Sequence, residues 1–330
     1  MNPSPRLALI GAGIAGLSCA TALQQAGLEV SLFDKGRGPG GRMSTRRGDD
    51  WQCDHGAQYC TARRAEFRAE VARWQQAGVA DLWKPRLWRF DGDSREHRES
   101  TVERFVGTPA MTAPARYLAS TLSVKTPANI QQIGRQAHGW QVCSAEHGWL
   151  EPRFSAVLLA VPAPQVAPLF KQLAPELFAL ADSAVMRGSW ALMLRFAAPI
   201  DLTFDAAFVN QGPLRWIARN SSKPGRNGEK TWLLHARPEW SEAHLEDDSE
   251  RVAAALLDAF GQLGGPAPQD WTAHRWRYAD TELPLDEGCA WRSDIGVGLC
   301  GDWLDGGKLE GAWLSGRALA ERVLRSFAGH

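Results

Sequence analysis

The chain has 330 residues, with 37 basic and 37 acidic side chains that cancel in charge. At roughly 100 to 200 residues per domain, this length predicts two domains. The charge balance, and the lack of a basic stretch interleaved with aromatic residues, argues against nucleic acid as a partner.

The sequence also shows no pattern typical of a membrane span or a signal peptide. No apolar stretch reaches the roughly 20 residues that span a bilayer, which argues against a membrane protein. The short apolar run at the N-terminus is broken by glycines and continues into a motif, unlike a signal peptide. We therefore expect a soluble, cytoplasmic protein.

Cysteine and tryptophan usage gives two further constraints. The six cysteines are scattered without a Cys-x-x-Cys pair, which favours reduced, buried thiols over a disulfide framework or a zinc site. We predict no bound metal. Fifteen tryptophans accompany only three tyrosines, and flat indole rings suit a site that holds a flat ligand, although most of them should pack in the core.

The N-terminal segment carries a dinucleotide-binding pattern. Residues 6–10 predict a buried parallel strand, which runs directly into Gly11, Gly13 and Gly16 and then a helix rich in small residues. These glycines permit a tight turn, close approach of a pyrophosphate, and close packing of helix on strand. The next predicted strand ends on Asp34, whose carboxylate can accept hydrogen bonds from an adenosine ribose.

The glycine triplet alone does not distinguish NAD from FAD. Downstream, Gly40-Gly41-Arg42 indicates a flavin, because the loop amides can face the second phosphate while Arg42 neutralises it or covers the edge of the isoalloxazine. The polar, glycine-containing segment at residues 54–59 should lie beside the flavin ring. Its His55 is either a proton carrier or a structural histidine, and we favour the structural interpretation.

A matching pattern lies near the C-terminus. Residues 295–300 predict a short buried strand that ends on Gly301-Asp302, followed by a helix at 313–327. A carboxylate at this strand end can hold the hydroxyls of a ribityl chain. The helix start at Gly311 and Ala312 offers amides and the positive end of a dipole, which would stabilise negative charge on a reduced flavin.

Together the two ends resemble the flavin amine oxidase and renalase superfamily, over the whole chain. The middle of the chain most resembles bacterial renalase, through the motifs DHGAQY (54–59), VGTPAM (106–111), WLLHARPEWS (232–241) and HRWRYA (274–279). The resemblance implies an FAD-dependent oxidase of aberrant dihydronicotinamide dinucleotides, the 2-dihydro and 6-dihydro forms of NAD(P). Hydride would pass to flavin N5 and then to dioxygen, giving NAD(P)+ and hydrogen peroxide.

The resemblance also implies a mixed α/β fold (α+β overall). A Rossmann-like FAD-binding domain would carry a second domain built on a mostly antiparallel sheet, as in amine oxidases and p-hydroxybenzoate hydroxylase. We expect a discontinuous FAD-binding domain from residues 1–62, 106–165 and 289–330, and a substrate domain from 63–105 and 166–288. FAD should be held non-covalently, because no cysteine occupies the family's C-terminal attachment pattern.

Periodicity predicts the elements of the second domain. Strands are expected at 189–196, 207–209, 214–219, 231–235 and 271–279, and amphipathic helices at 66–77 and 249–263. Residues 87–105 should alternate like strands. The substrate pocket is expected between the two domains, where ligand sites often form.

Candidate site residues follow from these motifs. His235 and Arg237 are the candidate catalytic residues, and Trp216, Trp232 and Trp276 are candidate pocket walls, although strand alternation directs Trp232 away from His235. The residues expected to bind FAD are Gly11, Gly13, Ala15, Gly16, Asp34, Lys35, Gly41, Arg42, Met43, His55, Gly56, Ala57, Gln58, Ile130, Gly301, Asp302, Gly311 and Ala312. An arginine at the pocket mouth would suit a substrate phosphate, but the sequence does not single one out.

Other functions remain open at this level. An amine oxidase would share the flavin apparatus but normally needs an aromatic cage. Tyr59, Tyr117 and Tyr278 are the only tyrosines, although tryptophans could take their place. A flavin-binding protein without turnover is a second alternative. An isoprenoid desaturase would need a long apolar lining or a membrane-docking helix, and neither pattern is present. Oligomeric state, the electron acceptor and the choice between NAD and NADP forms are not encoded in any motif.

Overall fold

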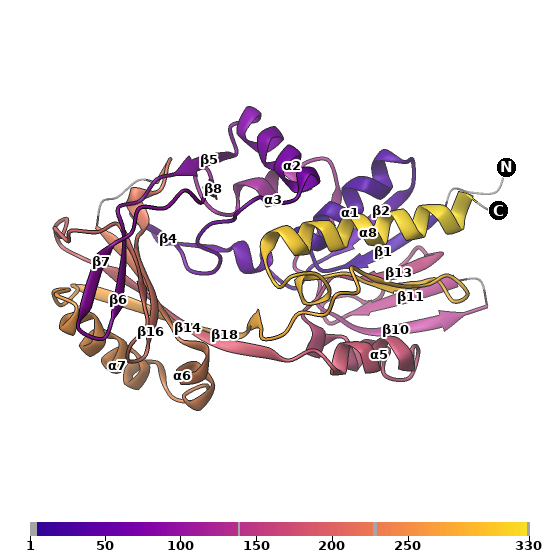
Figure 1. Ribbon diagram of the computed structural model, residues 1–330. Coiled ribbons are helices and arrows are strands. Elements are labelled where there is room, and N and C mark those ends of the chain that lie inside the picture. The colour runs from indigo at the N-terminus through magenta and orange to yellow at the C-terminus, as the bar shows by residue number, and fades with distance from the viewer. Residues whose placement is uncertain (1–4, 138, 227–229, 329–330) are drawn as a thin grey trace.

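The computed structural model describes residues 5–137, 139–226 and 230–328. Two sheets organise it, at opposite ends of the molecule in Figure 1. Within the described ranges, no helix combines the length and apolar composition that crossing a membrane requires.

The smaller sheet is the Rossmann-like part of this α/β fold. Its six strands run in the order β19-β20-β13-β1-β2-β9, and all pairs are parallel except β19 with β20. Their bounds are β1 (Arg6–Ile10), β2 (Glu29–Phe33), β9 (Ser123–Lys125), β13 (Ala156–Leu159), β19 (Ala290–Arg292) and β20 (Val297–Leu299). Both ends of the chain therefore contribute to one sheet.

Different layers cover the two faces of this sheet. One face carries α1 (Ile14–Gln25), on which the long α8 (Leu309–Ala328) packs, and Ser18 Oγ donates a 2.8 Å hydrogen bond to the Trp313 carbonyl. A small antiparallel sheet and two short helices pack over the other face. These are β10 (Ile130–Gln136), β11 (Gly139–Ser144), β12 (Gly148–Trp149), α4 (Ala167–Phe170) and α5 (Pro175–Asp182).

The larger sheet has seven strands in the order β18-β14-β17-β16-β15-β6-β7, antiparallel except for β6 with β15. Their bounds are β6 (Leu87–Asp91), β7 (Ser94–His97), β14 (Met186–Arg195), β15 (Ala206–Val209), β16 (Leu214–Arg219), β17 (Thr231–Ala236) and β18 (Asp270–Thr281). All five strands predicted for this region lie in it. The mostly antiparallel character of the second sheet is thus confirmed.

Alternation along β17 gives the two faces of this sheet different roles. Trp232 and Leu234 enter an apolar core that α7 (Ser249–Gln262) completes, whereas Leu233 packs on the opposite face against Cys53. That opposite face meets the hairpin of β3 (Thr45–Arg47) and β4 (Gln52–Asp54). The fold thereby brings the large sheet against the segment that follows β4.

The remaining elements connect these parts. They are α2 (Ala65–Gln76), β5 (Ala80–Trp83), β8 (Arg104–Gly107), α3 (Ala113–Ala119), α6 (Pro238–Ala243) and the 3-10 turns η1 (Gly41–Met43), η2 (Ala163–Gln165), η3 (Asn220–Ser222) and η4 (Asp302–Leu304).

Two local differences from the sequence-based expectation have simple causes. The C-terminal helix begins at Leu309 rather than at Trp313, since the glycine at 311 is accommodated in its first turn. Residues 87–105 do not form one alternating stretch, because β6 and β7 turn back as a hairpin and β8 pairs with β5 instead. The boundary predicted between residues 105 and 106 falls inside β8, while the domain division as a whole stays a prediction.

Candidate functional site

The glycine turn after β1 has the geometry of a phosphate cradle. Gly11 has φ of +105°, and a Cβ atom there would lie 2.4 Å from the Ala160 carbonyl oxygen. A Cβ on Gly16 would lie 2.0 Å from the Gly11 oxygen, so these two glycines are required by the fold itself. A Cβ on Gly13 would meet nothing within 4 Å. Gly13 therefore faces open space at the N-terminus of α1, where a phosphate would approach the backbone.

Asp34 stands at the carboxyl end of β2, directly beside this turn. Its Oδ2 accepts a 2.6 Å hydrogen bond from the Ala12 amide, and its Oδ1 accepts one of 2.7 Å from the Gly36 amide. Each carboxylate oxygen can accept a second hydrogen bond, so ribose hydroxyls can still bind there. The predicted role of Asp34 is compatible with this geometry.

The two ends of the chain meet through Arg42 and Asp302. Arg42 Nη1 lies 3.0 Å from Asp302 Oδ2, and Nη2 contacts Oδ1, so the guanidinium is held at two points. Arg42 Nη1 also donates to the Ala279 carbonyl of β18, at 3.2 Å. Burial alone would lower the pKa of Arg42, but the Asp302 carboxylate outweighs it and raises that pKa. The two motifs predicted to bind FAD thus form a single charged site.

The segment from Asp54 to Gln58, here called the DHGAQ segment, lies against the same loop. The amides of His55 and Ala57 donate to the carbonyls of Ser44 (3.3 Å) and Arg42 (2.8 Å). A Cβ on Gly56 would lie 2.0 Å from the Arg42 oxygen, so only glycine fits there. The segment is consequently fixed relative to the Gly-Gly-Arg loop.

From the other side, the large sheet holds the same segment. The His55 carbonyl oxygen accepts two hydrogen bonds, from His235 Nε2 and from Trp276 Nε1, each 3.0 Å long. The His55 ring stacks on Trp276, with centroids 5.2 Å apart, and meets His274 edge-on at 4.7 Å. We call these four side chains, His55, His235, His274 and Trp276, the imidazole–indole wall.

The imidazoles of this wall are neutral at pH 7. Burial, reinforced by nearby His274 and Arg46, lowers the pKa of His55 to about 3. Burial also lowers the pKa of His235 to about 4. His55 Nδ1 is buried and has no hydrogen-bond partner among the described residues. At neutral pH these rings can position a flat ligand, but they do not supply a charged acid.

Arg237 does not join His235. Strand β17 ends at Ala236, so the alternation that would have placed residues 235 and 237 on one face stops there. Arg237 instead precedes α6, with its side chain 41% exposed and its Nε 3.7 Å from Glu239. The two predicted catalytic residues therefore occupy different surroundings.

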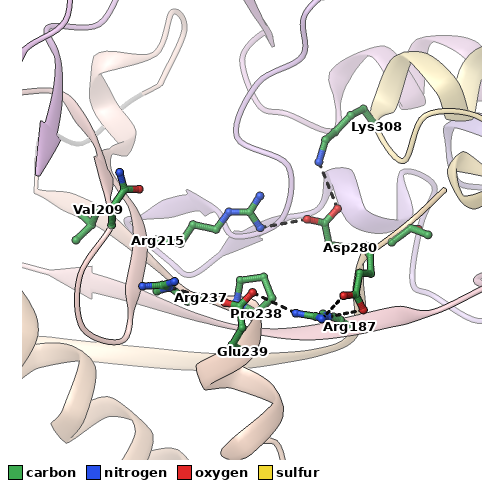
Figure 2. Close-up of a pocket in the computed structure, with 11 residues that line it drawn as sticks. Arg187, Val209, Arg215, Arg237, Pro238, Glu239, Asp280 and Lys308 are labelled. Atoms are coloured by element: carbon green, nitrogen blue, oxygen red, sulfur yellow. Dashed lines mark hydrogen bonds and ion pairs between the residues drawn. The ribbon is translucent and has the colours of Figure 1, made fainter. Parts of the chain in front are cut away.

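Arg237 lines a cleft of about 590 Å³ between the large sheet and the start of α8, here called the charged cleft (Figure 2). Asp280 lies between Arg215 Nη1, at 3.1 Å, and Lys308 Nζ, at 3.4 Å. The basic residues of the cleft are Arg187, Arg215, Arg237 and Lys308, and the acidic ones are Glu239, Asp280 and Glu282. Four cations against three anions leave the cleft with one net positive charge.

The three candidate wall tryptophans have different surroundings. Trp276 contacts His55, as described above. Trp216 is 5% exposed and packs beside Tyr59, with centroids 5.7 Å apart. Trp232 is wholly buried on the opposite face of the sheet, edge-on to Phe204. Because Trp232 is buried in the core of the opposite face, it does not line the pocket, as the alternation of the strand predicts.

A buried ion cluster lies behind the DHGAQ segment, and the sequence analysis missed it. Asp54 Oδ2 pairs with Lys223 Nζ at 3.1 Å and Arg226 Nη2 at 2.6 Å, and all three side chains are fully buried. Lys223 Nζ also donates to Gln58 Oε1 at 3.0 Å. Burial would raise the pKa of Asp54, but the two cations outweigh it and hold that pKa far below its usual range.

No local sequence pattern predicts that a lysine is buried. The one sequence feature that could have indicated this cluster is the pair of cations at positions 223 and 226, on either side of Pro224 and Gly225. It makes the Gln58 side chain part of the scaffold, because its Nε2 also donates to the Asp54 carbonyl.

The other predicted FAD-binding residues are distributed around this centre. Ala15, Met43 and Ile130 are buried, at 6%, 3% and 8% exposure, while Lys35 and Gly41 are exposed. The Gly301 amide donates to Ser315 Oγ at 2.9 Å. Gly311 and Ala312 lie in the first turn of α8, where the Ala312 amide already donates to the Lys308 carbonyl.

Comparison with known proteins identifies the family of this chain. Residues 9–71 match the model of the NAD(P)-binding Rossmann-like domain, and residues 64–324 match that of the flavin-containing amine oxidoreductases. The second match covers most of the chain. The protein belongs to the flavin-containing amine oxidoreductase family. It is therefore an FAD-dependent oxidoreductase, and the open backbone at Gly13 and the remaining acceptor capacity of Asp34 are compatible with this cofactor.

A curated relative aligns with most of the chain. Among curated proteins, the chain is 28% identical to the tRNA 5-methylaminomethyl-2-thiouridine biosynthesis bifunctional protein MnmC of Magnetococcus marinus, covering 86% of this chain. That match spans only 48% of the relative, so the chain covers about half the length of this curated protein.

Solved structures of oxidases superpose over nearly the whole chain. Wild-type putrescine oxidase bound to putrescine gives a TM-score of 0.74 at 13% identity, covering 98% of this chain and 99% of that one. Cyclohexylamine oxidase from Brevibacterium oxydans IH-35A gives 0.73 at 12% identity, covering 99% and 100%. At such identities the likeness concerns the fold.

Proposed function

We propose that this flavoprotein oxidises dihydronicotinamide dinucleotides that carry hydride at the wrong ring carbon, the 2-dihydro and 6-dihydro forms of NAD(P), to NAD(P)+. Dioxygen would be the final acceptor, giving hydrogen peroxide. The observation that carries the proposal is the charged cleft, whose four basic and three acidic side chains leave a positive excess. A positive excess favours a substrate with a pyrophosphate and disfavours a cationic amine.

The protein side chains have binding and orienting roles in this scheme. Bound FAD supplies the hydride acceptor. The imidazole–indole wall offers flat, uncharged rings that suit a nicotinamide, and the wall is joined to the DHGAQ segment through the His55 carbonyl. Arg215 and Arg237 line the charged cleft, where they suit the pyrophosphate. A dihydronicotinamide is already a hydride donor, so positioning rather than a strong base is what the reaction needs.

Amine oxidation is the second candidate, and the family match favours it. Tyr59 with Trp83 and Trp216 forms an aromatic group in which an amine could lie. Against this, the Arg104 guanidinium stacks on Tyr59, with its central carbon 5.3 Å from the ring centroid. A fixed cation on that ring opposes binding of a second, positively charged ligand there.

Anaerobic stopped-flow mixing tests the proposal. The FAD-loaded protein is mixed with 2-dihydro-NAD, 6-dihydro-NAD, ordinary NADH, putrescine or cyclohexylamine, and the oxidised flavin band is followed. Fast bleaching by the two isomers, but not by NADH or amines, is expected. Bleaching by an amine alone would replace the proposal with amine oxidation, and no bleaching by any of them would indicate a flavin-binding protein without turnover on these compounds.

We also propose that FAD is bound non-covalently by the discontinuous domain of residues 1–62, 106–165 and 289–330. The cysteines of the described chain are free, and five of the six are buried. Acid denaturation followed by ultrafiltration should release the yellow colour into the filtrate. Colour retained on the polypeptide would contradict the non-covalent assignment.

A further inference from the structure

A second hollow opens beside the charged cleft. It has a volume of about 390 Å³ and lies between β6, the segment that precedes β8, and β15. Asn210, which directly follows β15, lines both this hollow and the charged cleft. We call the hollow the distal pocket, and Asn210 is the residue that it shares with the charged cleft.

Arg104 in the distal pocket is a buried cation without a counter-ion. Its exposure is 7%, and no carboxylate of the described residues forms an ion pair with it. Nη1 donates to Ser100 Oγ at 2.9 Å and to the Val102 carbonyl at 3.0 Å, while Nε is buried without a hydrogen-bond partner. The guanidinium also stacks on the Tyr59 ring, but no carboxylate of the described residues balances its charge. Buried charges are normally paired with an opposite charge, so a buried guanidinium that lines a pocket without a carboxylate partner indicates an anionic ligand.

Two further arginines line the same pocket. Arg89 pairs with Asp91 outside the lining, and Arg98 approaches Glu96 only at 3.9 Å. Together with Arg104 they give three cations, against the single lining carboxylate of Glu99. Arg104 has no carboxylate partner among the described residues and Arg98 has only a distant one, so these two cations are available to a phosphate monoester, which carries about −1.5 to −2 at pH 7.

An aromatic face completes the site. Phe208 lines the distal pocket and packs on Trp216, with ring centroids 4.8 Å apart, so its ring is held in place. A fixed aromatic ring beside guanidinium groups suits a nucleobase that carries a phosphate on its sugar. The pocket therefore has the chemistry for an adenosine with a monoester phosphate.

We infer that the distal pocket binds the adenosine 2′-phosphate of the substrate and makes the NADP-derived isomers the preferred substrates. This inference rests on the proposed function. A dinucleotide would place its nicotinamide near the imidazole–indole wall, its pyrophosphate in the charged cleft and its 2′-phosphate beside Arg89, Arg98 and Arg104. Asn210 would lie where the chain of phosphates passes from one hollow to the other.

The first test uses ligands that cannot be oxidised. FAD-loaded protein, whose own adenosine site is filled, is titrated calorimetrically with 2′,5′-ADP and with 5′-AMP. We expect 2′,5′-ADP to bind at least tenfold more tightly, because the extra phosphate gains charge-assisted hydrogen bonds. The double variant R89Q/R98Q should remove most of this difference. Equal affinity for the two ligands in the unmodified protein would overturn the inference.

The second test follows turnover. In R89Q/R98Q the KM for 6-dihydro-NADP should rise by roughly tenfold with kcat unchanged, while both constants for 6-dihydro-NAD stay the same. R104K should keep most of the affinity and R104Q should lose it. The matched control is R95Q, since Arg95 lies on β7 outside both hollows and contacts the Gln262 carbonyl at 3.5 Å.

The outcomes separate the inference from the proposed function. Loss of 2′,5′-ADP affinity in R95Q equal to that in R89Q/R98Q would reduce the effect to general surface charge and overturn the inference. If no dihydro isomer reacts but 2′,5′-ADP still binds selectively, the proposed oxidation fails and the phosphate site stands. Unselective binding together with fast oxidation of the isomers would support the proposed oxidation and overturn the 2′-phosphate site.

Discussion

His235 Nε2 lies 3.0 Å from the main-chain carbonyl oxygen of His55 and joins β17 of the large sheet to the DHGAQ segment. The two residues are 180 positions apart in the chain. Because the amides of this segment are bonded on the other side to the Gly-Gly-Arg loop, the contact links the large sheet to that loop. His235 therefore has a positioning role that can be tested without knowing the substrate.

Replacing His235 with leucine should weaken this link. The His55 carbonyl would keep only the Trp276 donor, and we expect a loss of about 1 to 2 kcal/mol in the free energy of unfolding, measured by urea denaturation. The matched control is His97→Leu, since His97 is exposed on β7. Equal denaturation midpoints for the two variants would show that the hydrogen bond from His235 does not contribute to the stability of the fold.

Replacing Asp54 with asparagine should destabilise the protein much more. Lys223 and Arg226 would remain fully buried without their shared carboxylate, and breaking a buried pair in this way costs about 3 to 5 kcal/mol. Chemical denaturation of the FAD-free protein measures it. The control Asp294→Asn removes an exposed carboxylate paired with Arg292, a pair that solvent screens, and should leave the denaturation midpoint close to that of the unmodified protein.

Acid should destabilise the protein below about pH 6.5. The pKa values of about 3 for His55 and about 4 for His235 lie below the roughly 6.5 of an unfolded histidine, so the unfolded chain takes up these protons first. Stability from these rings is complete above pH 6.5 and is lost as the pH falls toward 4, by about 1.4 kcal/mol per unit for each ring. Urea midpoints between pH 7.5 and 5 test this, and H235L should show a shallower slope. A pH-independent midpoint would contradict the neutral, buried state of these rings.

Replacing Gly13 and replacing Gly16 with alanine should affect different properties, cofactor affinity in the first case and fold stability in the second. Gly13→Ala places a methyl group in open space, so the FAD-free protein should keep its thermal midpoint while its affinity for FAD falls. Gly16→Ala places a methyl group 2.0 Å from the Gly11 oxygen and should destabilise the fold before any cofactor binds. Differential scanning calorimetry and FAD titration separate the two effects. A drop in midpoint for Gly13→Ala as large as for Gly16→Ala would show that both glycines serve packing.

Much of the fold could be predicted because its signals are contiguous. The strand–turn–helix pattern around Gly11, the acid at Asp34 and the strand that ends at Gly301 are local features whose spacing is set by backbone geometry. Alternation and helical periodicity similarly predicted the strands of the large sheet and the helix at 249–262. These patterns determined the fold class and the FAD cofactor, and the family match confirms both.

Only the tertiary structure decided how charged side chains pair. Asp54 with Lys223 and Arg226, and the unpaired Arg104, involve burial and contacts between distant segments, which no local pattern records. The same limit applies to Arg237, whose direction depended on where β17 stops. The sequence by itself determined the nucleotide motif and the sheets, because hydrophobic periodicity and glycine spacing act over neighbouring residues. The charge balance of the cleft and pocket was decided by packing, because an ion's partner and its distance from water are properties of the assembled fold.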